Sequence, residues 1–300
     1  MTSHSCDDVD RQSRDVWLGT AFLAGFALLS STVGVFNRLI ETDAWTMIFW
    51  RGLFGGLFAM AVLTCRDGRK AWAAVRAIGR DGVVVVFCSA LATVCFLNAL
   101  RFTSVADVLV IHATMPFMTA GLAWLVIGER EDGITLGASL AAVLGVAIMV
   151  GPALADTRLL GDVLAFGMAA FLSVMTVFLR KRRAVDMMPA TGLSALVCAA
   201  IVLPFAQPMA VDGWNFFLLV LFGGQFGVAL LLLALGSRLV SATRTALFSI
   251  LDTPLGPLWM WLVFGEASTA ASLLGGAIVM AAVVADILLP RAKKAIHQPS

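Results

Sequence analysis

The stretch Asp107–Glu129, DVLVIHATMPFMTAGLAWLVIGE, decides the fold, because the chain repeats it in altered form at Arg244–Glu266, RTALFSILDTPLGPLWMWLVFGE. Each copy has 23 residues. With an offset of 137 residues, the clearest identities between the copies fall at Trp124, Leu125, Val126, Gly128 and Glu129. Because the second copy lies in the other half of the chain, we infer that a half-protein was duplicated.

Both copies are long and apolar enough to cross a bilayer core, which needs about 20 helical residues. The chain has 300 residues, of which 60% are hydrophobic and 13% charged, and its mean hydropathy is +0.94. A soluble domain carries about 25% charged residues. The composition therefore predicts a polytopic membrane protein with the lipid bilayer as its surroundings.

Charge and cysteine usage exclude several other classes. The formal net charge is only +2, and no basic face alternates with aromatic residues, so we expect no nucleic-acid partner. The five cysteines are odd in number and show no CxxC spacing. They predict neither a disulfide framework nor a metal site, and nothing in the sequence calls for a cofactor.

Apolar runs bounded by charge, glycine or proline divide the chain into five spans and a second five. We expect residues 1–16 to form a polar tail that is retained and not a signal peptide, because four aspartates stand there without a compact basic region. Residues 17–151 and 161–289 are the two predicted repeats, and residues 290–300 are a second tail. The ten predicted spans are 17–36, 44–64, 82–100, 104–127, 133–151, 161–179, 188–206, 215–235, 240–264 and 268–289.

Lysine and arginine bias in the loops predicts the orientation, because cytoplasmic loops hold the excess. With the N-terminus inside, sixteen basic residues lie on the inner side, and only Arg38, Arg101 and Arg158 lie outside. Both termini are therefore predicted to be cytoplasmic, in a multi-pass protein of the inner membrane. Since five is odd, the second repeat must enter the membrane from the opposite side. The predicted fold is an all-α membrane protein of ten helices in two inverted five-helix repeats.

These residues resemble the drug/metabolite transporter superfamily and, within it, the EamA-type carriers. The resemblance rests on the segment 98–104, NALRFTS, on Pro116 with the motif around Trp124, and on Pro254 with the corresponding motif around Trp261. It implies a carrier with a central cavity that opens alternately to either side. Relatives often place an acidic residue directly before the second-repeat proline, whereas here the order is Asp252-Thr253-Pro254.

Ionisable residues within spans are the first candidates for cargo or proton binding. Asp252 lies near the middle of its span, where a charge is expensive, so it should be paired with another helix, be protonated or bind cargo. Arg51 and Asp107 both lie in the predicted outer half of the membrane and could form a structural or gating pair.

Arg244 and His112 complete the set of substrate or proton candidates. Arg244 begins about one turn from the inner face, where its side chain could instead extend to the interface. His112, one turn before Pro116, could bind cargo or carry a coupling proton, or could simply be hydrogen-bonded in place.

Prolines near span centres and polar or aromatic residues are candidates for cavity lining or hinges. A proline frees a backbone carbonyl, which a membrane tolerates only against protein or a wet cavity, although a fixed packing kink is the competing interpretation. Tryptophans could stack a flat cargo or anchor at the interface. Asn98 could equally bind helices together. The candidates are Pro116, Pro254, Pro257, Asn98, Trp50 and Trp259.

The resulting hypothesis is a secondary transporter of small polar metabolites that works by alternating access. By resemblance, amino acids or related compounds are the favoured cargo, and export is the favoured direction. An intramembrane enzyme acting on lipid or peptide and a passive channel are the alternatives. The sequence contains no HExxH motif and no P-loop, so we predict no enzyme and no ATP. Small-residue faces at residues 52–56 and 275–276 suit either a homodimer or packing within one chain.

Overall fold

The computed structural model of this chain describes residues 3–68, 75–103, 105–150, 159–183, 185–265 and 269–289. It describes side chains from Arg14 onward, except at positions 97, 100, 101, 105, 106 and 150. Within these ranges the regular elements are all helical. They are α1 (Ser3–Ser30), α2 (Val33–Leu39), α3 (Ala44–Asp67), α5 (Gly79–Phe102), α6 (Val105–Ala113), α7 (Met115–Ile127), α8 (Gly133–Val150), α9 (Leu159–Lys181), α10 (Met188–Val202), η3 (Leu203–Phe205), α11 (Gly213–Leu239), α12 (Ala242–Ser249), α13 (Asp252–Phe264) and α14 (Ala270–Leu288).

In the described part of the chain, nine helical segments are long and apolar enough to cross a membrane, judged by length and composition. They correspond to nine of the ten predicted spans. The remaining predicted span, 133–151, falls on α8, whose apolar segment Gly133–Met149 is shorter. The all-helical membrane class is therefore confirmed.

Two boundaries differ from the sequence prediction. The first helix begins at Ser3, so most of the predicted polar tail is part of α1. The apolar segment of this helix begins at Arg14. Polar residues can extend a helix beyond the hydrocarbon core, where water and neighbouring charges surround them. Helix α14 begins at Ala270, two residues after the predicted start of its span, and its N-cap is Thr269, whose hydroxyl accepts from Ser272 N.

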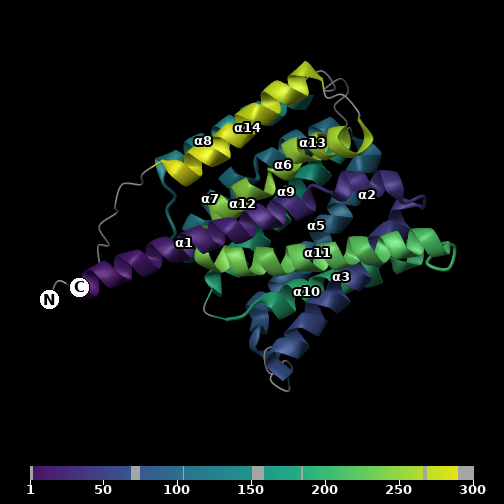
Figure 1. The fold of residues 1–300 in the computed structure, drawn as a ribbon, viewed down its shortest axis with the longest axis horizontal. Coiled ribbons are helices and arrows are strands. Elements are labelled where there is room, and N and C mark those ends of the chain that lie inside the picture. The colour runs from purple at the N-terminus through teal and green to yellow at the C-terminus, as the bar shows by residue number, and fades with distance from the viewer. Residues whose placement is uncertain are drawn as a thin grey trace.

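The helices pack in pairs that join distant parts of the sequence (Figure 1). Helix α8 lies beside α14 along one edge of the molecule, and α3 lies beside α10 along the opposite edge. Between them, α1 packs against α11, and α5 packs against α9. Helix α1 begins and α14 ends on the same side of the molecule, which is the left side of Figure 1.

Glycines allow these helices to approach closely. A Cβ atom at Gly52 would lie 2.8 Å from Ala195 O on α10, and one at Gly55 would lie 2.8 Å from Phe226 Cδ1 on α11. Between α8 and α14, a Cβ at Gly145 would lie 2.7 Å from Gly275 O. These small-residue faces therefore serve helix packing within the chain.

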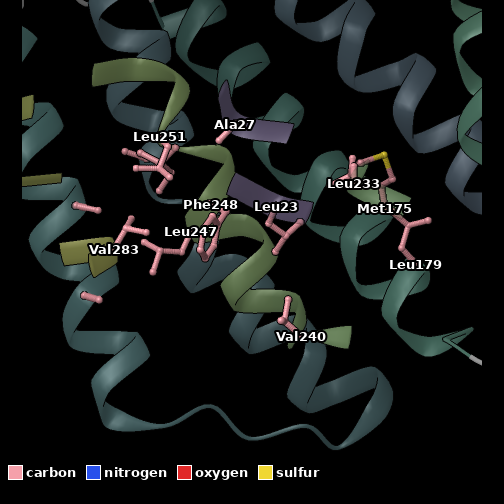
Figure 2. Close-up of a cluster of buried hydrophobic side chains, with 14 of the residues drawn as sticks. Leu23, Ala27, Met175, Leu179, Leu233, Val240, Leu247, Phe248, Leu251 and Val283 are labelled. Carbon is pink, nitrogen blue, oxygen red and sulfur yellow. The ribbon is translucent and has the colours of Figure 1, made fainter. Parts of the chain in front are cut away.

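The largest hydrophobic cluster surrounds the short helix α12 (Figure 2). Leu247 and Phe248 of α12 are almost fully buried, at 0% and 1% exposure. Figure 2 shows them between Val283 of α14 and Leu23 of α1. Because α12 is enclosed on several sides, its polar residues must find partners inside the protein.

Candidate functional site

Three spanning segments are broken, two near their centres and the first nearer its end. The predicted spans 104–127 and 240–264 are interrupted at Thr114 and at Ile250–Leu251, and the first span is interrupted at Ser31–Thr32. At each of the first two breaks the backbone forms hydrogen bonds to the third residue before, as in a 3₁₀ turn. Examples are Thr114 N to Ile111 O (3.0 Å) and Leu251 N to Phe248 O (3.2 Å). The prolines that follow cannot donate a backbone hydrogen bond, which explains why the α-helical hydrogen bonding is interrupted there.

The break at Ser31–Thr32 has no proline and arises from the two hydroxyl groups. Ser31 Oγ donates to Leu28 O and Thr32 Oγ1 donates to Leu29 O, each at 2.8 Å. Such bonds from side chain to backbone compete with the helical pattern and bend helices. Sequence reasoning missed this break, although adjacent serine and threonine in an apolar helix are a usable signal.

The structure places His112 and Asp252 within electrostatic range of each other. His112 is in the last turn of α6, just before the break at Thr114, and Asp252 is the first residue of α13, just after the break at Leu251. The two side chains are close enough to interact electrostatically, and the carboxylate also accepts a hydrogen bond from its neighbour Thr253 Oγ1 at 3.4 Å. The segments broken at Thr114 and at Ile250–Leu251 thus contribute one ionisable group each, and these two groups interact electrostatically.

Two polar side chains tie other elements to the break in the first span. Trp259 Nε1 donates to Ser31 Oγ at 2.8 Å, which joins α13 to the end of α1. Gln225 Nε2 of α11 donates to Leu29 O, while its Oε1 is buried without a hydrogen-bond partner among the described residues. Trp259 therefore makes a polar contact between α13 and the end of α1 at this break.

No ion pair between Arg51 and Asp107 is found in the described part of the chain. The Arg51 guanidinium instead lies over the ring of Phe226, 3.8 Å from its centroid, on the side of α3 that faces α11. Asp107 Oδ2 lies 3.0 Å from Thr103 Oγ1, at the meeting of α5, α6 and α9. The two residues were matched by depth in the membrane, but depth does not determine which neighbours a helix faces.

Arg244 does not extend to the interface. Its Nε donates to Asp286 Oδ2 at 2.6 Å and its Nη2 to Asp286 O at 3.2 Å. Thr135 Oγ1 of α8 donates to the other carboxylate oxygen at 2.7 Å. With Arg244 4% exposed and Asp286 fully buried, this cluster joins α8, α12 and α14. Asp286 is not among the residues predicted from sequence.

A polar cavity of about 370 Å³ opens beside this cluster. Arginines and carboxylates line it, and Glu129 Oε1 pairs with Arg180 Nη2 at 3.2 Å. Burial raises the pKa of the Glu131 carboxyl, and the nearby charges of Glu129 and Asp286 raise this pKa as well. Hydrogen bonds from the hydroxyls of Ser241 and Thr243 act in the opposite direction and lower it. We call this the basic-end cavity. Its charged lining residues are Asp15, Glu129, Arg130, Glu131, Asp132, Arg180, Arg183, Arg238 and Arg244.

The remaining candidates have mainly structural surroundings. Pro254 and Pro257 line an apolar groove of about 470 Å³ between α13 and α14, and Pro116 is buried in the first turn of α7. Asn98 Nδ2 donates to Val94 O of its own helix at 2.8 Å. Trp50 packs among aromatic rings, with its centroid 5.1 Å from that of Phe54.

No group of three or more His, Cys, Asp or Glu side chains that could hold a metal is found in the described part of the chain. An acid and an imidazole within electrostatic range of each other can bind a polar ligand or exchange a proton.

Known proteins resemble this chain along most of its length. The model of the EamA-like transporter family matches residues 17–151. Two curated relatives, each named pseudopaline exporter CntI, from two strains of Pseudomonas aeruginosa, are 26% identical over 282 residues, which cover 89% of this chain and 95% of theirs. An uncharacterized transporter of Archaeoglobus fulgidus is 25% identical over 270 residues, with the same two coverages.

A crystal structure of another protein has the same fold. Its TM-score is 0.78, over 92% of this chain and 98% of that one, at 18% sequence identity. These comparisons agree with the apolar helices and with the motif residues around Trp124. The first half of the chain thus matches the EamA-like transporter family, and the relatives named as transporters support an EamA-type transporter of the drug/metabolite transporter superfamily and not an enzyme.

Proposed function

We propose that this chain is a secondary carrier that exports a small polar metabolite across the cytoplasmic membrane by alternating access. The proposal includes ten spans in two inverted five-helix repeats, with both termini in the cytoplasm. The observation that carries it is the meeting of His112 and Asp252, one from each of two segments that are broken at corresponding positions.

Corresponding element bounds support the repeat. Helices α7 and α13 begin at Met115 and Asp252 and end at Ile127 and Phe264, both 137 residues apart. Each is followed by a glycine at φ 68°, Gly128 or Gly265. A positive φ suits glycine and ends a helix, so both segments end in the same way.

The contacts between helices support the same symmetry. The α5–α9 contact has its counterpart in α11–α1, and the α10–α5 contact has its counterpart in α3–α11. Helices α3 and α10 pack on each other, as do α8 and α14. Two similar halves can exchange conformations around a fixed site, which exposes that site to each side of the membrane in turn.

The proposed site lies at the two central breaks. Breaks free backbone groups that a membrane tolerates only against protein or water. In the proposed mechanism, Asp252 binds a polar group of the cargo or a coupling proton, and His112 sets the charge beside it. Movement of one repeat against the other then exposes the pair to the opposite side.

Export is favoured because two relatives are named exporters. Pseudopaline is accordingly one compound to test, and amino acids are another class, which the family resemblance favours. The excess of basic residues around Arg180–Arg183 and Arg238 supports a cytoplasmic basic end. A homodimer would need a surface other than the glycine faces, because these are used within the chain.

Metabolite comparison tests the proposal. Cells that express the wild type or Asp252→Asn at matched membrane levels are compared by untargeted analysis of cell contents and medium. We expect the wild type to shift an unmodified compound class into the medium and Asp252→Asn to shift it at least tenfold more slowly. New chemical products in place of redistribution would contradict the proposal in favour of an enzyme.

Reconstitution then separates a carrier from a channel. Purified protein in liposomes should exchange labelled for unlabelled cargo with saturation and counterflow, and an imposed pH gradient should accelerate net flux if a proton is coupled. Flux that neither saturates nor shows counterflow would assign the protein to the passive channels.

A further inference from the structure

Arg51 is a cation within an apolar helix, and the structure gives it aromatic rings as neighbours. Its guanidinium carbon lies 3.8 Å from the ring centroid of Phe226 and 5.4 Å from that of Phe222. Phe222 is 1% exposed, and its other contact is a stacked ring from α2, Phe36, at 4.9 Å. The arginine therefore points from α3 into the helix packing, toward α11 and α2.

No carboxylate pairs with Arg51 among the described residues. Its Nε atom is buried and has no hydrogen-bond partner there. The titratable group that faces it is the thiol of Cys198 on α10, which in turn lies against Thr93 of α5. A thiol and two rings compensate a guanidinium inside a membrane span only in part, because a cation–π contact contributes about 0.5–2 kcal/mol.

A charge within a membrane span is expensive, and proteins keep such charges there mainly for function. Arginine differs from lysine because its planar group presents paired N–H donors that match a carboxylate. The rings lie against the guanidinium carbon, and the buried Nε–H has no hydrogen-bond partner among the described residues. The surroundings are apolar, so a single anionic group would be held strongly.

We propose that Arg51, held between α3 and α11 by Phe222 and Phe226, binds a carboxylate group of the cargo. The inference rests on the proposed carrier function and names its substrate class, a metabolite that bears a carboxylate. Arg51 then recognises the anion, whereas His112 and Asp252 act at the helix breaks. A cargo with both an anionic and a cationic group could engage Arg51 and Asp252 in turn.

Binding to the full-length protein in lipid nanodiscs tests this without knowledge of the natural cargo. The probes are benzoate, its neutral isostere benzamide, and chloride at equal ionic strength, and the readout is the melting temperature. We expect benzoate alone to raise it, with at least tenfold weaker binding in Arg51→Met. Arg38→Met, which removes an exposed arginine of α2, is the control and should bind benzoate normally.

Alkylation of Cys198 provides a second readout, in a variant that retains this cysteine alone. Benzoate should slow the reaction with N-ethylmaleimide, and benzamide should not. If Arg51→Met folds poorly, Arg51→Lys and Phe226→Leu test the same site, and both should weaken benzoate binding. Equal effects of the acid and the amide, or an effect that persists without Arg51, would overturn the proposal. Equal effects of chloride would assign the site to an inorganic anion and overturn it as well.

These outcomes separate the inference from the carrier proposal. Saturable export that is unchanged in Arg51→Met would leave the carrier standing and refute the carboxylate site. Benzoate binding that depends on Arg51, in a protein that moves no cargo in liposomes, would leave the site standing and refute the carrier.

Discussion

Arg244 and Asp286 form an ion pair in the interior of the bundle, with 2.6 Å between Arg244 Nε and Asp286 Oδ2. The second carboxylate oxygen is held by Thr135 Oγ1, so both oxygens of a fully buried carboxylate are satisfied. One helix from the first half of the chain and two from the second meet at this point. The same arginine also lines the basic-end cavity.

Replacing Asp286 by alanine should destabilise the protein strongly, because it leaves the Arg244 guanidinium buried and unpaired. The expected loss in the free energy of unfolding is about 3–5 kcal/mol. Unfolding in mixed micelles by a denaturing detergent measures it. The double variant Arg244→Met/Asp286→Leu should recover most of the loss, because it buries no charge. An Asp286→Ala protein as stable as the wild type would contradict the pairing.

Close packing of α8 against α14 predicts a second stability effect. A Cβ atom at Gly275 would meet Gly145 O and lie 2.5 Å from Met149 Cγ. Gly275→Ala should therefore cost about 1–3 kcal/mol, as overpacking of a tight contact does. Gly137→Ala is the matched control on α8, since a Cβ there meets nothing within 4 Å. Equal unfolding curves for the two variants would show that the helices can separate without cost.

The spans and two of the three breaks could be predicted from sequence because they have local causes. Apolar runs bounded by charge indicate spans, and the prolines at 116 and 254 cannot donate to the helical ladder. The break at Ser31 also has a local cause, the adjacent hydroxyl groups of Ser31 and Thr32, although these are a weaker signal than a proline because they bend a helix only when they bond to its backbone.

The pairing of charges could not be predicted, because it depends on which helix faces which. Arg51 and Asp107 are at similar predicted depths, but α3 faces α10 and α11 while α6 faces α8 and α9. Asp286 lies near the end of its span, where a carboxylate can reach water. Only the packing of α8 and α12 around α14 buries it.

The carboxyl of Glu131 predicts a pH dependence of stability. Its pKa is raised in the folded protein by burial and by the charges of Glu129 and Asp286. The folded state therefore holds a proton that the unfolded state releases, and stability falls as pH rises from the ordinary glutamate range through the raised pKa. Below that range both states are protonated, and the penalty is absent.

Glu131→Gln should remove this loss of stability at rising pH, because glutamine carries no ionisable proton. Its melting temperature should fall less than that of the wild type between acidic and neutral pH, and it should exceed the wild-type value at neutral pH. Melting curves in nanodiscs at a series of pH values measure both differences. Parallel pH profiles for the two proteins would show that Glu131 ionises normally.

His112 and Asp252 should be coupled in transport, because their side chains interact across two helix breaks. His112→Gln and Asp252→Asn should each slow export about tenfold or more, and the double variant should be no slower than the slower single variant. Contacting residues typically show coupling energies of about 0.5–3 kcal/mol in such a cycle. Asn98→Ala is the control, because Asn98 bonds only to the backbone of its own helix in the described structure, and export should change less than about twofold. Export rates at matched membrane levels complete the cycle. Losses that simply multiply would mean that the two residues act independently, and a site shared by the two broken segments would then have to be abandoned.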